Sequence, residues 1–321
     1  MLWRESRKPG RSRVALAAPF LIPSPKPPHR TPRIPARLSF LLLLSSILLF
    51  NAAARCGEPG TRAVIFVQGL YTTLDEDGTQ TSLVEEHRFE TMKRAFIDAD
   101  YKPQQLLDYS YEGGAVSSTG VWKPEAYACE VTDRQALKSV ELLEQMVRDY
   151  RKKHPKARVT LVGHSLGGWV AYLAGVREAE RAKGDRIGID GVVTLDAPLR
   201  GASPDKKPLI DLFGCEKTYI AGAELVVIRA DASTDATRAA QAQTMTAAGV
   251  RLATLGNLND CLWATVRCLG GTWVDDGPTQ FIEGAELSRG YEVLSGPLQS
   301  HEAILIDPAA IADVVAFVGN P

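Results

Sequence analysis

One serine in the sequence has neighbours that would allow it to act as a nucleophile. Ser165 lies between glycines in the run Gly163-His164-Ser165-Leu166-Gly167-Gly168. The apolar stretch 158–162 precedes this run, and the helix-compatible stretch 169–174 follows it. A sharp strand-to-helix turn holds a serine hydroxyl clear of the backbone, and glycines are needed because side chains would clash there. The pattern therefore predicts a nucleophilic serine rather than an ordinary exposed serine in a glycine-rich connection.

This run resembles the nucleophile elbow of the lipase/esterase branch of the α/β-hydrolase superfamily, as in bacterial lipases and GPI inositol-deacylase-like proteins. A weaker resemblance lies at residues 193–201, where such enzymes often carry a strand that ends in a T-P-x-x-G-like turn. The likeness covers roughly residues 62–318 and is strongest at the elbow. It implies the α/β-hydrolase fold, with a mostly parallel, doubly wound sheet and helices on both faces, and it implies ester chemistry.

A serine nucleophile needs a base within hydrogen-bonding reach, and in this fold the base follows the acid along the chain. Among the five histidines, His301 has this position, between an expected last strand at 291–294 and a C-terminal helix. We therefore predict His301 as the base. His164 lies inside the elbow itself, and we expect it to point away from that base.

Asp260 is the predicted acid, which orients the imidazole and stabilises its charged form. It follows an expected strand at 250–255 and the turn-like residues 256–259. Asp196 is the alternative acid because it directly ends an earlier strand, and Asp275 and Asp276 come third. Cys261 and Cys268 could close a small loop beside Asp260.

The developing oxyanion needs backbone donors, which we expect from the N–H groups of Leu166 and Leu70. Leu70 belongs to the turn Gln68-Gly69-Leu70-Tyr71 after the apolar run 63–67. Gln68 stands where the commoner pattern has histidine. A backbone donor survives this change, but the hydrogen bonding that fixes the turn is left open.

The remaining chain alternates between strand and helix signals, as a parallel sheet requires. Thr132 and Gln135 suggest a capping box that opens a helix running to Lys153, before Pro155. Asp307 and Pro308 suggest the start of the last helix. Expected strands lie at 63–67, 106–110, 158–162, 191–195, 225–229 and 250–255, an irregular loop at 111–128, and either a mobile cap or a packed crossover helix at 199–222.

Charge and apolar content divide the chain. Residues 1–37 form a basic, proline-rich tail, either disordered or the product of a misplaced start. Residues 38–55 have the layout of a signal peptide, with a membrane anchor as the alternative, and 56–321 are expected to form a single α/β-hydrolase domain. Beyond residue 55 the chain has 27 Lys and Arg against 37 Asp and Glu, a net charge of −10, which argues against nucleic acid as a partner.

These observations predict a serine hydrolase that cleaves carboxylic esters through an acyl-enzyme, either secreted or held at the cell envelope. The substrate would be a small-molecule or lipid ester, with membrane association through residues 38–54 as an option. No C-x-x-C or H-x-x-x-H pattern occurs, and we expect neither a metal nor an organic cofactor. The alternatives are a catalytically silent binding module of the same fold at the envelope, or an acyltransferase or thioesterase. The sequence leaves the oligomeric state open.

Overall fold

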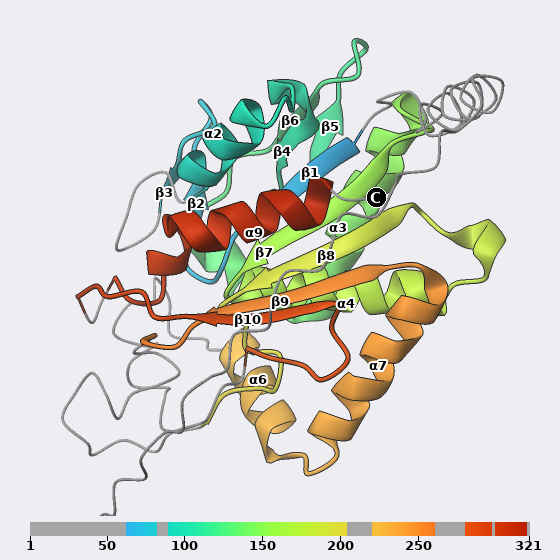
Figure 1. The fold of residues 1–321 in the computed structure, drawn as a ribbon. Coiled ribbons are helices and arrows are strands. Elements are labelled where there is room, and N and C mark those ends of the chain that lie inside the picture. The colour runs from blue at the N-terminus through green and yellow to red at the C-terminus, as the bar shows by residue number, and fades with distance from the viewer. Residues whose placement is uncertain (1–61, 82–88, 204–219, 261–279, 297–298, 320–321) are drawn as a thin grey trace, which may run out of the picture. The chain divides into compact units, whose positions relative to one another are not determined.

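A six-stranded parallel sheet lies at the centre of the computed structural model (Figure 1). The structure describes residues 62–81, 89–203, 220–260, 280–296 and 299–319, all within the compact unit Pro59–Pro321. The strand order is β10-β9-β8-β7-β1-β4, and every neighbouring pair is parallel. The strands are β1 (Arg62–Val67), β4 (Leu106–Asp108), β7 (Arg158–His164), β8 (Ile189–Leu195), β9 (Arg251–Asn257) and β10 (Leu287–Tyr291).

Helices cover both faces of this sheet, as Figure 1 shows. One face packs against α2 and α9 through an apolar core that includes Met92, Phe96 and Val314. The other face packs against α3 and α4 through a second core, which includes Leu143 and Val170. The helices are α2 (Glu90–Asp98), α3 (Ala136–Lys153), α4 (Leu166–Glu180), α6 (Ile220–Ala230), α7 (Thr234–Ala248) and α9 (Pro308–Gly319). The expected doubly wound α/β sheet is confirmed.

The direction in which successive strands are added to the sheet reverses next to β1. The chain runs from β1 to β4 on one side and then crosses to β7 on the other. Where the connections diverge in this way, the carboxyl ends of the strands leave a crevice that binds ligands. Two short hairpins accompany this region, β2 (Thr73–Leu74) with β3 (Gln80–Thr81) and β5 (Gly114–Val116) with β6 (Trp122–Pro124). The second hairpin lies in the stretch 111–128, which was expected to be irregular throughout.

The apolar run 225–229 forms part of helix α6, so its assignment as a strand was wrong. A short apolar run fits a buried strand and a buried helix equally well by periodicity. The carbonyl oxygen of Leu225 accepts the Ala202 N–H at 3.1 Å, and the Leu225 side chain packs into the core. Val227, by contrast, is 70 % exposed.

Three element boundaries also differ from expectation. The last strand, β10, ends at Tyr291 instead of beginning there. The strand expected at 106–110 is shorter and ends at Asp108. Helix α3 begins at Ala136, and the expected capping box at Thr132 is wrong. Thr132 lies in the 3-10 turn η2 (Cys129–Thr132), where its Oγ1 accepts the N–H of Tyr71 at 2.8 Å. Its hydroxyl therefore serves the loop after β1 rather than a helix end.

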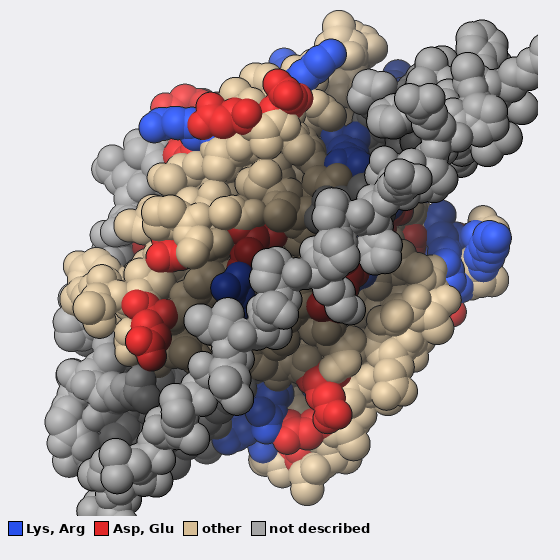
Figure 2. All heavy atoms as spheres, in the orientation of Figure 1, with Lys and Arg blue, Asp and Glu red and all other residues tan. Residues whose placement is uncertain are grey.

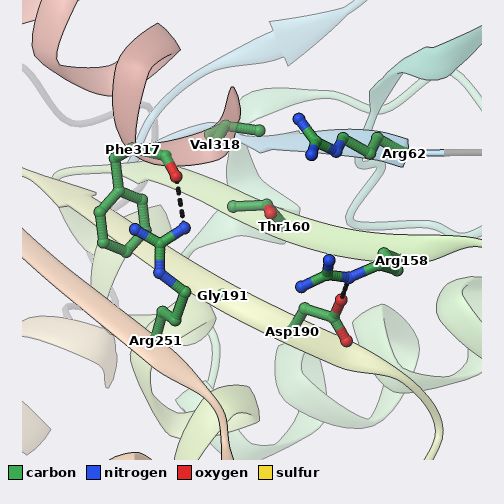
Figure 3. A pocket seen from close by; sticks show the side chains of 8 residues that line it. All are labelled: Arg62, Arg158, Thr160, Asp190, Gly191, Arg251, Phe317 and Val318. Carbon is green, nitrogen blue, oxygen red and sulfur yellow. Dashed lines mark hydrogen bonds and ion pairs between the residues drawn. The ribbon is translucent and has the colours of Figure 1, made fainter. Parts of the chain in front are cut away.

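Arginines gather at the amino-terminal edge of the sheet, opposite the edge at which Ser165 lies (Figure 3). Arg251 donates to the Phe317 carbonyl oxygen at 2.6 Å, and Arg158 pairs with Asp190. Cations here offset the partial negative charge at the C-terminal end of α9. The cavity that these residues share with Arg62 measures about 20 Å³, room for about one water molecule. These contacts therefore hold the C-terminal end of α9 to the sheet.

Acidic and basic side chains are interspersed over the described part of the face that Figure 2 shows, without a continuous basic surface. In the described ranges, no helix has the length and apolar character needed to cross a membrane. The predictions for residues 1–61, most of the suggested cap, the loop between Cys261 and Cys268, and the third-choice acids Asp275 and Asp276 fall outside the described residues.

Candidate active site

Ser165 occupies the turn between β7 and α4. Its φ of 55° and ψ of −129° lie in a region that non-glycine residues rarely adopt, and such strain costs about 1–3 kcal/mol. The Ser165 N–H donates to the Leu195 carbonyl oxygen at 2.9 Å, and the Ser165 carbonyl oxygen accepts from Gly168 at 3.0 Å. The turn is thus anchored to β8 on one side and to the first turn of α4 on the other.

The glycines of this turn are required by close packing. A Cβ atom on Gly167 would collide with the carbonyl oxygens of Val67 and Gln68 at the end of β1. A Cβ atom on Gly168 would lie 2.5 Å from the Cβ of Ala197. Since α4 begins this close to two strands, a larger residue would push the helix and Ser165 away from the sheet.

His301 and Asp260 form a hydrogen-bonded pair at the same edge of the sheet. The His301 Nδ1 lies 2.6 Å from the Asp260 Oδ2. Asp260 is fully buried, and the His301 side chain is 15 % exposed. With Nδ1 held by the carboxylate, Nε2 is the ring atom left to act as a base.

His164 connects this pair to the elbow. Its ring centre lies 4.7 Å from that of His301, and its Nε2 donates to the His301 carbonyl oxygen at 2.7 Å. The expectation that His164 points away from the base was therefore wrong. The residue directly before Ser165 holds the backbone of the residue predicted to activate it.

Asp196, the alternative acid, occupies a different environment. It is fully buried with a φ of 46°, and its Oδ1 accepts the Asn257 N–H at 2.6 Å. Burial raises the pKa of Asp196 well above its usual range, and the nearby charge of Asp260 adds to this rise. A carboxyl group whose charged form is disfavoured is less suited to stabilise an imidazolium. This raised pKa, together with the 2.6 Å contact between Asp260 Oδ2 and His301 Nδ1, favours Asp260 as the partner of His301.

The same residues are the candidates for holding a cation. Among the described residues, His164, Asp196 and His301 form the one such group whose donor atoms all lie within 4.8 Å of one another. A cation bound there would engage His301, and His301 could then no longer accept a proton from serine. Metal binding and serine chemistry therefore exclude each other at this place.

The turn after β1 lies directly against Ser165. A Cβ atom built on Gly69 would come within 2.9 Å of the Ser165 Cβ and 3.4 Å of its Oγ. Leu70 follows this glycine, and Leu166 opens α4, where the first N–H groups of a helix have no acceptor within the helix. Both predicted oxyanion donors thus belong to segments that flank the serine.

The hydrogen bonding left open by Gln68 is visible in the structure. The Gln68 side chain is buried and donates to the side chain of Gln80. Three further hydrogen bonds hold the turn: Tyr111 OH to Gln68 O at 2.7 Å, Thr72 Oγ1 to Gly69 O at 3.0 Å, and Tyr71 N to Thr132 Oγ1 at 2.8 Å. The roles of Tyr111 and Thr132 at this turn were not predicted from the sequence, because no local pattern marks a partner so far along the chain.

A parallel, doubly wound sheet with a strained serine between strand and helix, and a His–Asp pair beside it, defines the α/β-hydrolase fold. A family model described as lipase (class 3) matches residues 83–202, less than half of the chain. The resemblance to the lipase/esterase branch is therefore supported by sequence over that segment. The comparison with curated proteins gave no match.

Solved structures with a similar fold include three bacterial proteins. The phospholipase PlaB from Legionella pneumophila aligns at 14% identity over 64% of this chain and 42% of its own, with a TM-score of 0.41. This chain thus spans less than half of that phospholipase. A lipase-esterase related protein from Clostridium acetobutylicum aligns at 11% identity over 82% and 96% of the two chains, with a TM-score of 0.44. A putative aryl esterase from Burkholderia cenocepacia aligns at 19% identity over 82% and 92%, with a TM-score of 0.39. Scores this low carry no argument about substrate or mechanism.

Proposed function

We propose that this protein is a serine hydrolase that cleaves carboxylic esters of lipids or small molecules through an acyl-enzyme. The observation that carries the proposal is the meeting of the strained Ser165 turn with the His301–Asp260 pair, joined through His164. A silent binding module would have no need for a buried carboxylate 2.6 Å from an imidazole beside such a serine. The lipase family model over residues 83–202 supports the same class of chemistry.

In this mechanism the Ser165 hydroxyl attacks the ester carbonyl carbon, and His301 takes up the hydroxyl proton through Nε2. Asp260 holds the ring in the tautomer with Nδ1 protonated and stabilises the imidazolium. The N–H groups of Leu70 and Leu166 stabilise the oxyanion, and α4 adds the positive end of its dipole. His301 then protonates the leaving alcohol, and water, activated by the same ring, releases the acid.

The test is a fluorophosphonate probe combined with hydrolysis of short p-nitrophenyl esters. Wild-type protein should be labelled and should hydrolyse the esters. Ser165→Ala should lose labelling and drop in kcat by about 10³-fold or more, with unchanged circular dichroism. An unlabelled wild-type protein would show that the serine is not activated. An active Ser165→Ala variant would show that another residue is the nucleophile.

We further propose that the protein is exported, either released after cleavage of residues 38–55 or anchored through them. The apolar run after Arg33 and Arg37 motivates this proposal. Disulfides persist in oxidising compartments, so a disulfide at Cys129 would be consistent with export. Cell fractionation with N-terminal mass spectrometry separates the two forms: a mature chain that starts near residues 54–56 supports release, and full-length protein in the membrane fraction supports the anchor.

A further inference from the structure

One buried amide joins the two segments that carry the acid and the base. Asn257 is the last residue of β9 and is almost completely buried. Its Oδ1 accepts the N–H of Asn259 at 3.0 Å, and its Nδ2 donates to the carbonyl oxygen of Ser300 at 2.9 Å. Asn259 directly precedes Asp260, and Ser300 directly precedes His301.

These contacts close a ring of hydrogen bonds. The backbone N–H of Asp260 donates to the Asn257 carbonyl oxygen at 3.1 Å, so Asp260 is tied back to the same residue. The ring then runs from the Asp260 carboxylate to His301, from His301 to the Ser300 peptide, and from there to the Asn257 amide. Every step is a hydrogen bond or a short covalent path. The separation between acid and base is thus fixed locally, at the end of one strand.

The backbone of His301 is held on both sides of its Cα. The peptide before it is held by Asn257 through Ser300 O, and the peptide after it by His164 Nε2 at 2.7 Å. With both peptides held, the two partners constrain the backbone of His301 and hence its Cα–Cβ direction, and the Asp260 carboxylate holds the ring through Nδ1. His164 already belongs to the elbow, whereas Asn257 is the contact that couples base to acid.

We propose that Asn257 is the positioning residue of the hydrolase, which sets the geometry of the His301–Asp260 pair without touching the substrate. This inference rests on the proposed serine chemistry. An amide suits the place because it offers a donor and an acceptor together. Its Oδ1 also accepts the Val293 N–H at 3.1 Å, so a flipped amide would direct its NH₂ group at two N–H donors.

The decisive variant is Asn257→Ala, with Asn257→Leu as its companion. Both remove the donor and the acceptor, and leucine keeps the same number of side-chain heavy atoms as asparagine, so an effect common to both is not caused by an empty space. A displacement of about 1 Å at a reacting group costs about 10²-fold in rate. We expect both variants to lose about 10²-fold in kcat for short p-nitrophenyl esters, with KM within about threefold of wild type.

Thr254→Val is the matched control. Thr254 lies on the same strand, is fully buried, and donates one hydrogen bond from Oγ1 to Ser288 at 3.1 Å, away from the site. It should lower the melting temperature to a similar extent and leave kcat unchanged. A loss of kcat in Thr254→Val equal to that in Asn257→Ala would reduce the effect to general destabilisation and overturn the proposal.

A measurement independent of activity separates this inference from the proposed function. The 2.6 Å bond to Asp260 should give the His301 Nδ1 proton a strongly downfield nuclear magnetic resonance signal, assigned by its absence in His301→Gln. The signal should weaken or vanish in Asn257→Ala and persist in Thr254→Val. If it persists in Asn257→Ala, the positioning role is wrong even where esters are hydrolysed. If it vanishes while wild-type protein is inert to fluorophosphonate, the positioning role stands and the proposed function fails.

Discussion

The difference in unfolding free energy between Asp196→Asn and wild type should shift in favour of Asp196→Asn as pH rises. Burial and the charge of Asp260 raise the pKa of Asp196 in the folded protein well above the usual range, whereas the unfolded chain has an ordinary aspartate. Between these two pKa values the folded protein keeps a proton that the unfolded chain has lost. The unfolding free energy of wild type therefore falls with pH over this window.

The magnitude follows from the binding of one proton. When the folded state binds one more proton than the unfolded state, the unfolding free energy changes by about 1.4 kcal/mol per pH unit. Asparagine resembles the protonated acid and has no such dependence. Its Oδ1 can still accept the Asn257 N–H, which Asp196 accepts at 2.6 Å. For a domain of this size, the difference corresponds to roughly 3–6 °C in melting temperature per pH unit.

The assay compares melting temperatures of wild type and Asp196→Asn from about pH 4.5 to about pH 6.5, a window above the usual aspartate pKa. Asp260, His164 and His301 face Asp196 and are present in both proteins, so the comparison measures the effect of replacing this one carboxyl group. Thr254→Val should show a difference from wild type that does not vary with pH. A constant difference for Asp196→Asn as well would refute the reasoning that Asp196 is protonated in the folded state.

Activity on one p-nitrophenyl ester separates the two candidate acids. Asp260→Asn should lower kcat by about 10⁴-fold, whereas Asp196→Asn should stay within about threefold of wild type. The reverse ranking would assign the role of the acid to Asp196. Gly69→Ala should lower kcat by about 10²-fold in a folded protein, since its Cβ would lie 2.9 Å from the Ser165 Cβ, whereas Gly184→Ala, with open space around it, should be neutral. Glu178→Ala should destabilise the fold by about 3 kcal/mol in urea titrations, because the buried Glu178 carboxylate accepts three backbone N–H groups at 187–189. Esterase activity per folded molecule should be unchanged, since Glu178 lies at the end of α4 opposite Ser165. An inactive but folded Glu178→Ala variant would contradict the view that Glu178 affects stability and not activity.

The elbow could be predicted from sequence because its requirements are local. A β-branched strand, a strained serine and glycines at positions where a Cβ would clash all fall within about ten residues of one another. The C-terminal helix was equally local, since Asp307 caps α9 through the Ala310 N–H at 2.8 Å. Both predictions depended on neighbours in sequence rather than on tertiary contacts.

The predictions were wrong where the local sequence is compatible with two structures and tertiary contacts decide between them. The run 225–229 carries strand-forming residues, yet it lies in a helix. Thr132 has the sequence of a cap, yet its hydroxyl bonds to Tyr71, 61 residues earlier. Asn257 seemed part of an ordinary turn, and its bond to Ser300 spans 43 residues. A single sequence contains no measure of such distant partners.

Gln68 stands where the commoner pattern has histidine. The oxyanion donor that we propose in this turn is a backbone N–H, so the proposed mechanism requires a fixed backbone and not a particular side chain. Gln68 contributes to that fixation through its buried bond to Gln80, and Tyr111 holds its carbonyl oxygen at 2.7 Å. The same logic governs His301, whose backbone is held by Asn257 and His164. In both halves of the site, buried polar side chains fix the peptide that carries the reacting group, so substitutions in these partners should impair kcat more than substrate binding.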